Sequence, residues 1–301
     1  MKYPFYILFL VLFINGLSAQ TSLAYRLSKG EVFTIKQKAT QIITQELDGA
    51  THELTNTING ILEFEVVADN DSLYDIALTF KDLNLLMTSS IQGELMNVNA
   101  KEVDPGNMQS QIFNSLLNRP VQMVLAKTGA ILEVNGGDSL VLKMAEASGL
   151  EDEFSLNMMK KSLEKEFGSD ALSSSYEQMT FIYPEKEVRI GDQWKNTYSG
   201  KLNSKNIWTL QERTSENASI SGTADIEMDV TELATTMKLS GSQETQITTD
   251  LHSGFIQKMT VKGFSKGTST MTQMGNQEIP TTIQSTTTYE LIDNLIQPIN
   301  N

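Results

Sequence analysis

The chain contains two histidines, His52 and His252, so any catalytic triad or imidazole-based metal site must use one of them. His52-Glu53 begins like the helical zinc-protease motif, but Asn56 stands where the second histidine must be, and the surrounding residues are typical of a strand. Each histidine lies beside a predicted turn, and the sequence marks no nucleophile next to either one. We therefore interpret both as exposed turn residues rather than catalytic bases.

Three acidic residues have the spacing of a possible second site. Asp225, Glu227 and Asp229 alternate with apolar residues, which places their carboxylates on one face of a predicted strand. Such a row could bind Ca²⁺ or supply the acid and base of a glycosidase. The simpler interpretation, which we favour, is the solvated face of an amphipathic strand.

The sequence offers no other recognisable reaction centre. It has no cysteine, and hence neither a thiolate metal ligand nor a disulfide. It also lacks the P-loop, the dinucleotide-binding fingerprint and the G-x-S-x-G elbow. We expect a protein that is not an enzyme and that needs neither a metal nor a cofactor.

Methionine is abundant, with 14 residues in the chain, and many of them lie in predicted helices and adjoining strands. Flexible, polarisable side chains suit surfaces that accept apolar ligands of several shapes, although they also fill ordinary gaps in a core. If the helices and a curved sheet enclose a cavity, we expect it to bind a lipid or another apolar small molecule. The residues that we predict to line such a cavity are Met108, Ile112, Met144, Phe154, Met158 and Phe167.

The first 19 residues have the layout of a secretory signal peptide. Lys2 precedes an apolar run over residues 5–14, and small residues follow up to Ala19. The run is shorter than the about 20 residues that span a bilayer, so we favour cleavage after Ala19 over a membrane anchor. The mature chain is then expected to have no integral membrane segment and to be periplasmic or secreted, with the periplasm favoured.

The charge of the chain limits its partners. The formal net charge is -14 at pH 7, and the lysines form no stripe. Such a chain repels phosphate backbones, so we expect no nucleic acid partner. Charge alone would not bring it to anionic lipid headgroups either.

Strand periodicity dominates both ends of the mature chain. Residues 31–47 and 53–68 predict a long hairpin that turns at Asp48-Gly49. Downstream, the apolar face switches parity, which predicts a bulge near Lys81 and Asp82.

Helical periodicity appears in the middle of the chain. Asp104 and Pro105 predict the start of a helix that runs to about residue 118. Asp138 or Ser139 is the expected cap of a second helix. The helices predicted in the central segment cover residues 138–148, 151–167 and 169–179. We divide the chain into a signal peptide (1–19), an N-terminal β-rich half with one helix (20–136), a helical segment (137–180) and a C-terminal β-rich half (181–301).

The two β-rich halves share short phrases. KGEVF at residues 29–33 and IGDQW at residues 190–194 both place a glycine and an acidic residue ahead of an aromatic one, and Gly129 and Gly254 open similar hairpins. The match favours an internal duplication in which each hairpin is the last of its half, and chance resemblance is the alternative. The predicted fold class is α+β, mostly antiparallel β: two similar curved sheets or half-barrels, packed together or joined edge to edge, with a helical segment between them.

Several phrases in this chain occur together in one known family. They are the KGE-aromatic start at residues 29–33, the Pro-x-Lys-x-Val-x-x-Gly-Asp-x-Trp phrase at 184–194 and the Thr-Asp-x-x-Ser-Gly turn at 249–254, after an export signal that ends in Ala-Gln. In these features the chain resembles an uncharacterised family of exported Bacteroidota proteins, over most of the mature sequence. That family has no assigned activity or catalytic residues, so the resemblance implies an architecture and a compartment but no chemistry.

These observations predict a soluble exported protein of unknown function, most simply a non-enzymatic binding or carrier module for an apolar ligand such as a lipid. The comparison with periplasmic lipoprotein carriers, which use a half-barrel and a helical lid, is one of architecture. One alternative is a structural or interaction protein of the cell envelope that binds an envelope protein through its sheet surface. The other is a hydrolase that uses the acidic strand face.

The signal peptide can be tested directly. We expect the chain recovered from the envelope of an exporting bacterium to begin at Gln20, as measured by intact-mass spectrometry. Replacing Leu10 with Arg places a charge in the apolar run and should leave the chain unprocessed in the cytoplasm. An exported protein that retains residues 1–19 would contradict cleavage and favour an anchor.

Overall fold

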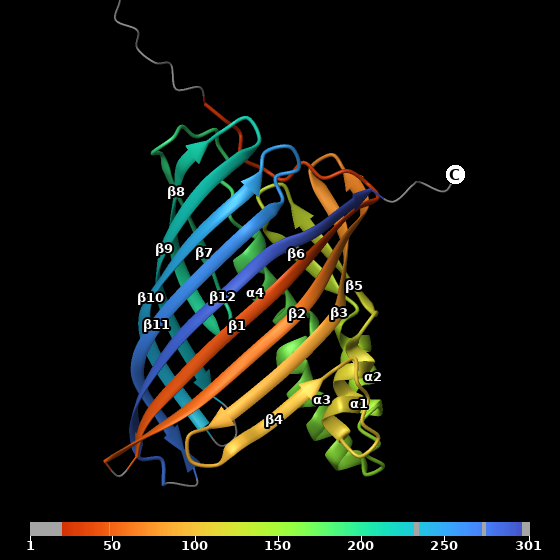
Figure 1. Cartoon of the computed structure of the whole chain (residues 1–301), viewed down its shortest axis with the longest axis vertical. Coiled ribbons are helices and arrows are strands. Elements are labelled where there is room, and N and C mark those ends of the chain that lie inside the picture. The colour runs from red at the N-terminus through yellow and green to blue at the C-terminus, as the bar shows by residue number, and fades with distance from the viewer. Residues whose placement is uncertain (1–19, 48, 232–234, 273–274, 297–301) are drawn as a thin grey trace, which may run out of the picture.

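The fold is an antiparallel sheet that curves around a group of helices (Figure 1). The computed structural model describes residues 20–47, 49–231, 235–272 and 275–296. The predicted signal peptide and Asp48 of the first predicted turn lie outside these residues. Within the described ranges, no helix has the length and apolar character needed to cross a membrane.

Twelve strands and four helices follow one another along the described chain. The strands are β1 (Glu31–Leu47), β2 (Ala50–Asn70), β3 (Leu73–Ser89), β4 (Gly93–Asn99), β5 (Pro120–Ala126), β6 (Ile131–Asn135), β7 (Gln193–Tyr198), β8 (Leu202–Arg213), β9 (Asn217–Thr231), β10 (Thr235–Asp250), β11 (Ile256–Met271) and β12 (Glu278–Ile296). The helices are α1 (Met108–Leu116), α2 (Gly137–Glu146), α3 (Glu153–Phe167) and α4 (Ser169–Thr180).

Hydrogen bonding joins these strands into a single sheet. Their order is β6-β5-β3-β2-β1-β12-β11-β10-β9-β8-β7, with β4 paired to β3. The two halves of the chain meet where β1 pairs with β12 along most of its length. The predicted class, mostly antiparallel β with a helical segment between two β-rich halves, is confirmed, and the two curved sheets are halves of one sheet joined edge to edge. An internal duplication stays a prediction.

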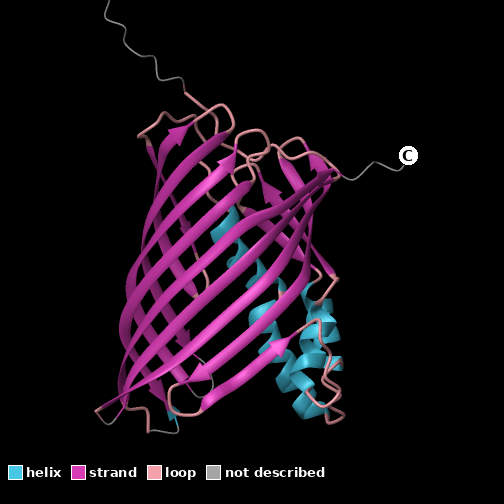
Figure 2. Cartoon of the chain, in the orientation of Figure 1, coloured by secondary structure: helices cyan, strands magenta, loops and turns pink. Residues whose placement is uncertain are grey.

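Bulges bend the long strands. The predicted bulge in β3 is confirmed, because its register with β2 skips Lys81 between Phe80 and Asp82. Further register shifts interrupt the pairing of β1 with β12 and of β8 with β9. An extra residue on one strand of a pair bends that strand and increases its twist. Figure 2 shows the result, a coiled sheet with the helices on its concave side.

Helix α4 lies at the seam between the two edges of the sheet, since it contacts both edge strands, β6 and β7. On one side, three side chains of β7 donate hydrogen bonds to the carbonyl oxygens of Phe181 and Ile182, just beyond the end of α4. On the other side, the Glu177 carboxylate accepts a hydrogen bond from the backbone of Ile131 in β6. Burial nevertheless raises the pKa of Glu177. The helix therefore covers two edges that would otherwise be open to pairing with other chains.

The N-terminal segment closes one end of the curved sheet, and we call residues 21–28 the strap. It is the red segment at the upper end of Figure 1. The backbone of Thr21 pairs with Val188, Tyr25 N–H donates to the Lys127 oxygen at 2.9 Å, and Arg26 N–H donates to the Ser253 oxygen at 2.7 Å. The strap thus joins three connections that are far apart in the sequence.

Tyr25 is the centre of this closed end. Its ring is 1% exposed and packs edge-on against Tyr183, with the ring centroids 5.2 Å apart. Its hydroxyl donates to the Thr180 carbonyl at 3.2 Å, and its own carbonyl accepts from the Tyr74 hydroxyl at 3.1 Å. Phe255 packs beside it. One side chain and its backbone therefore contact α4, β3 and the turn before β11.

The two repeated glycine phrases both meet the strap. Gly129 and Gly254 have φ values of +93° and +72°. A Cβ on Gly129 would overlap the Thr180 carbonyl, and one on Gly254 would overlap the Ala24 carbonyl; both would crowd Tyr25. The Gly129 turn joins β5 and β6 and closes the N-terminal half, as predicted, but the Gly254 turn joins β10 and β11, so the prediction that it is the last hairpin of its half is wrong.

The helix boundaries differ from prediction at their starts. Helix α1 begins at Met108 with Asn107 as its cap, because the Asp104 carboxylate accepts from Gly106 N–H and holds a turn there instead. Helix α2 starts at Gly137 without a side-chain cap, so the predicted capping by Asp138 or Ser139 is wrong. Helices α3 and α4 match their predicted ranges to within two residues, and α3 ends at Gly168 as predicted.

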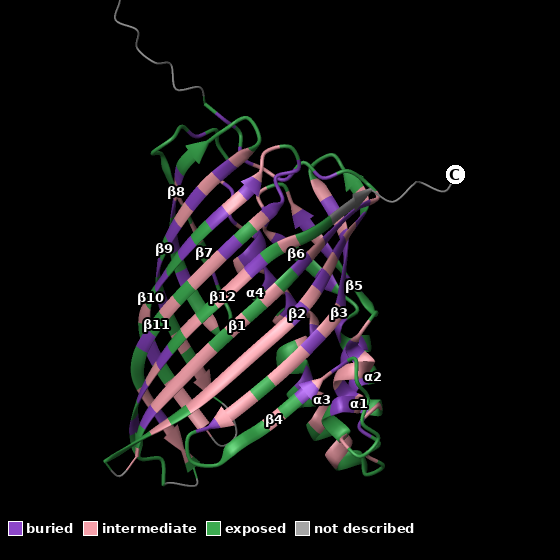
Figure 3. Cartoon of the chain, in the orientation of Figure 1, coloured by how far each residue is buried: buried purple, intermediate pink, exposed green. Residues whose placement is uncertain are grey.

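The core fills the strap end of the concave face. It includes Phe33 and Phe64 from the central strands, Tyr176 from α4, and Met144 from α2. Toward the opposite end, which we call the far end, the packing loosens. Figure 3 shows this in β2, where residues 54–59 are half-buried on both faces of the strand. The packing is therefore loose along this stretch of β2, while nearer the far end Gln45, Ser269 and Thr281 are again buried.

The strap contacts predict an unusual cost for one small substitution. Gly129→Ala should lower the free energy of unfolding by about 3 kcal/mol or more, because the methyl group collides with backbone and the positive φ is unfavourable. Gly191→Ala is the matched control, since Gly191 has φ +90° but open space around its Cβ. That control should cost about 1–2 kcal/mol. Urea unfolding of both variants measures the difference, and equal losses would contradict a special role for the Gly129 contact.

Candidate ligand-binding cleft

A cleft of about 540 Å³ lies on the concave face, where the core ends. Strands β12, β1, β2, β3 and β4 supply its floor, and Glu166, near the end of α3, lies at its edge. This volume is within the range of pockets that hold a single small-molecule ligand.

Strand register orders the floor of the cleft into rows. One row crosses five strands and consists of Ser285, Gln41, Asn56, Met87 and Met96. Residues that are neighbours in a row have their side chains on the same face of the sheet. That face is therefore polar over β12, β1 and β2 and apolar over β3 and β4 along this row.

The adjacent row also passes from polar to apolar, but its change falls between β12 and β1. Its members that line the cleft are Thr287, Ala39, Ile58 and Leu85, in the same strand order. Ile58 and Leu85 also pack against the core. The cleft therefore has one polar side and one apolar side, and its apolar side continues into the core.

The polar side contains an amide pair. The Asn56 Nδ2 donates to the Gln41 Oε1 at 3.2 Å. The Asn56 Oδ1 is buried and has no hydrogen-bond partner among the described residues. A buried oxygen that accepts no hydrogen bond lowers the stability of the folded protein, unless a ligand or a water molecule donates a hydrogen bond to it.

Glu166 also lines a second cleft of about 540 Å³, which lies between α3, α4 and the β7–β8 turn. Its carboxylate forms an ion pair with Lys201 from that turn. Both side chains are about half exposed, so the pair contributes little to stability. It marks the boundary between the two clefts.

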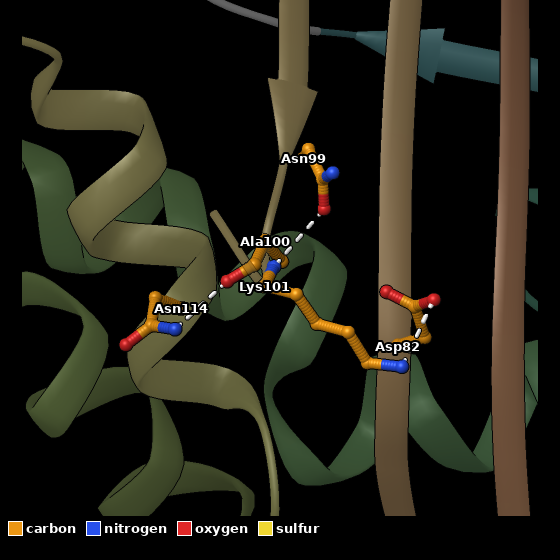
Figure 4. Close-up of polar contacts among 5 residues, drawn as sticks. All are labelled: Asp82, Asn99, Ala100, Lys101 and Asn114. Carbon is orange, nitrogen blue, oxygen red and sulfur yellow. Dashed lines mark hydrogen bonds and ion pairs between the residues drawn. The ribbon is translucent and has the colours of Figure 1, made fainter. Parts of the chain in front are cut away.

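The apolar wall formed by β4 is held in place by polar contacts at its end (Figure 4). Lys101 N–H donates to the Asn99 Oδ1 at 3.1 Å, and the Lys101 ammonium lies 3.3 Å from Asp82 in the bulge of β3. Asn114 of α1 donates to the Ala100 carbonyl at 2.8 Å. These contacts connect the end of β4 to β3 and α1.

The six residues predicted to bind a ligand lie outside this cleft. Ile112 and Met144 are buried in the core, and Phe167 is half-buried, with its ring packed against Phe80 and Phe113. Met108, Met158 and Phe154 are exposed, Phe154 to 74%. The structure does not bring these six side chains into one cavity, and their contact with a ligand stays a prediction.

The prediction that His52 is an exposed turn residue is wrong. It is half-buried on the inner face of β2, and its Nε2 lies 3.0 Å from the Ser89 Oγ. That hydroxyl already accepts from the backbone N–H groups of Ile91 and Gln92. With its acceptor capacity used, Ser89 caps a turn and is not free to attack a substrate. His252 is exposed in the β10–β11 turn, as predicted.

The acidic row of β9 lies on the convex side of the sheet. Asp225, Glu227 and Asp229 are exposed, while Ala224 and Ile226 are buried, which confirms the interpretation as a solvated face. In the described part of the chain, no group of three or more His, Cys, Asp or Glu residues could hold a metal ion.

Buried tyrosines adjoin the cleft and the core. Tyr289 follows Thr287 on the inner face of β12, where burial raises its pKa to about 12. Burial also raises the pKa of Tyr176, with a smaller contribution from Tyr289, and of Tyr25, Tyr183 and Tyr198. These hydroxyls stay protonated in the folded protein well above pH 10.

Three comparisons relate the chain to known proteins. A family model described as "Family of unknown function (DUF6263)" matches residues 71–256. None of the curated proteins matches the chain.

Among solved structures, one of lipovitellin, on its lipid–protein interactions, is similar over 92% of this chain, with 10% sequence identity and a TM-score of 0.53. This chain spans 26% of the lipovitellin chain, so the likeness is to part of that protein and concerns the fold. An outer membrane channel from Pseudomonas putida F1 covers 89% of this chain and is covered over 97% of its own, at 7% identity and a TM-score of 0.25. That score is too low to support an argument.

The buried tyrosines predict sensitivity to alkali. Because the pKa of a buried tyrosine is higher in the folded state than its unfolded value of about 10, rising pH deprotonates the unfolded chain first. The free energy of unfolding is therefore highest below pH 10 and falls as the pH rises toward 12. Tyr289→Phe should reduce the fall in unfolding free energy between pH 9 and 11 by about 1 kcal/mol. Urea unfolding at several pH values measures it, and a variant that loses stability as steeply as the unmodified chain would contradict the assignment.

Proposed function

Because the chain belongs to the DUF6263 family, whose function is unknown, we propose a function from its geometry: a non-enzymatic binding or carrier module that holds a lipid or another apolar ligand in the cleft on the concave face. The observation that carries the proposal is the cleft itself. Its apolar side continues into the core, and the residues of β2 beside it are half-buried.

The character of the cleft supports small-molecule binding. Pockets for such ligands are concave and mostly apolar, with a few polar groups that fix orientation. Here Leu85, Met87 and Met96 provide apolar surface, and Gln41 and Asn56 provide hydrogen-bonding groups. The two methionines can adapt to ligands of different shape.

The likeness to lipovitellin supports the same proposal at the level of the fold. In both proteins a large sheet of this shape is present, and the lipovitellin structure concerns lipid–protein interactions. Since identity is 10%, no residue role is transferred from lipovitellin to this chain.

We also propose that the protein acts outside the cytoplasm, in the periplasm or after secretion. The support is the signal-like layout of residues 1–19. That it is not an enzyme is part of the proposal, supported by the capped state of Ser89 and by the outward position of the β9 carboxylates.

A second candidate function is an interaction protein of the cell envelope. The observation that favours it is the exposure of large apolar side chains away from the cleft, above all Phe154 at 74% and Ile91 at 70%. Loss of a partner on changing Phe154, with ligand binding intact, would distinguish this candidate from the first.

Cleft binding is tested with an apolar fluorescent probe, N-phenyl-1-naphthylamine, and the chain that begins at Gln20. We expect Met87→Lys to weaken probe binding by at least about tenfold, because it places a charge in the apolar side of the cleft. Phe264→Lys is the matched control: Phe264 is also on a strand but is 44% exposed on the convex face. Equal affinity of the unmodified chain and Met87→Lys would place the probe elsewhere and contradict the proposal.

Native mass spectrometry of the protein purified from its own envelope without detergent complements this test. We expect an added mass that organic solvent removes. A control carrier prepared in the same way establishes that ligands survive the procedure.

A further inference from the structure

We propose that the ligand is a neutral amphiphile: its uncharged, hydrogen-bonding head lies over β12, β1 and β2, and its apolar part lies over β3 and β4. This inference rests on the proposed function and adds the chemical class of the ligand. It follows from three observations on the cleft, namely the order of its rows, the unmet hydrogen bond and the charges at its edge.

The direction of the ligand follows from the order of the rows. Ser285, Gln41 and Asn56 are consecutive neighbours across three strands, and Met87 and Met96 continue the same row. Strands lie about 4.8 Å apart, so the polar part extends for about 10 Å and the apolar part follows directly. A fully apolar ligand would leave the polar side without partners, which favours a molecule with two chemically different ends.

The head must supply a hydrogen-bond donor. The Asn56 Oδ1 is buried without a partner among the described residues, and the Nδ2 of the same amide donates to Gln41. Ser285 and Thr287 add hydroxyls that can donate or accept. A hydroxyl-bearing head, such as that of a glycerol monoester, can satisfy these groups together.

The charges around the cleft disfavour an anionic head. In the described part of the chain, the residues that line the cleft include one charged side chain, Glu166, which is acidic and is paired with Lys201. The adjoining cleft has three lysines and three acidic residues, so it offers no excess positive charge. The net charge of -14 adds a long-range repulsion of anions.

The test compares two ligands that share one chain and differ in the head. Displacement of N-phenyl-1-naphthylamine from the chain that begins at Gln20 is measured with 1-lauroylglycerol and with laurate, at neutral pH, about 150 mM salt and below their micelle concentrations. We expect 1-lauroylglycerol to bind at least about tenfold more tightly, because laurate would have to bury a charge without a counter-ion.

Two variants connect the preference to the polar row. Asn56→Leu and Gln41→Leu should each reduce the affinity for 1-lauroylglycerol relative to laurate by roughly tenfold, as expected for loss of hydrogen bonds to the uncharged head. Asn59→Leu is the matched control, because Asn59 is on the same strand but on the convex face. Urea unfolding of each variant shows whether it is folded.

The outcomes separate this inference from the proposed function. Laurate binding as tightly as 1-lauroylglycerol would overturn the neutral head, and unchanged preference in both row variants would overturn the role of the polar row. In either case probe binding would leave the carrier proposal standing. Failure of the probe and of both lipids to bind would overturn the carrier proposal, and this inference with it.

Discussion

The structure depends on the contact of one tyrosine with parts of the chain that are far apart in sequence. The Tyr25 ring packs against Tyr183 and Phe255. Its hydroxyl donates a hydrogen bond to the last carbonyl of α4, and its backbone carbonyl accepts one from the Tyr74 hydroxyl of β3. A twelve-stranded sheet of this length could remain open or roll further. The strap fixes its curvature at one end, because the turns before β6 and before β11 must both reach the same short segment. Once that end is closed, the two edge strands lie within reach of α4.

The strap also explains the repeated phrases. The glycines of both turns are required because a backbone carbonyl lies where a Cβ would be. Two turns with the same task acquire similar sequences, whether or not the halves share an ancestor. The other phrases of the family resemblance lie at the same end. Glu31 accepts from Ser28 N–H within the strap, Trp194 donates to the Ile182 carbonyl, and Asp250 holds the turn at Ser253. These phrases are thus explained by contacts that close the fold.

Local patterns made most of the elements predictable, and long-range register made the cleft unpredictable. The bulge in β3 can be predicted because the apolar residues change from one strand face to the other within a few consecutive positions. The end of α3 can be predicted because a glycine, Gly168, directly follows its last residue. The cap of α1 was not, because Asp104 and Asn107 are both good caps and the choice depends on a turn at Gly106. The pairing of Gln41 with Ser285 could not be found at all, since it joins strands at opposite ends of the chain. For the same reason the sequence predicts ligand contacts for methionines of the helices, whereas Met87 and Met96 of the strands line the cleft.

The two ends of the molecule therefore have different physical tasks. At the strap end, aromatic packing and backbone hydrogen bonds bury Tyr25 and its neighbours, and small changes there are expected to act on stability. Along the cleft, β2 continues with side chains that are only half-buried, so changes there are expected to act on what the cleft accepts. Long strands make this division possible. One part of β1 and β2 contributes to the core, and another part lines the cleft, where the strand register decides which polar and apolar side chains are neighbours. A ligand that donates a hydrogen bond to the Asn56 Oδ1 would stabilise the sheet around the cleft by binding.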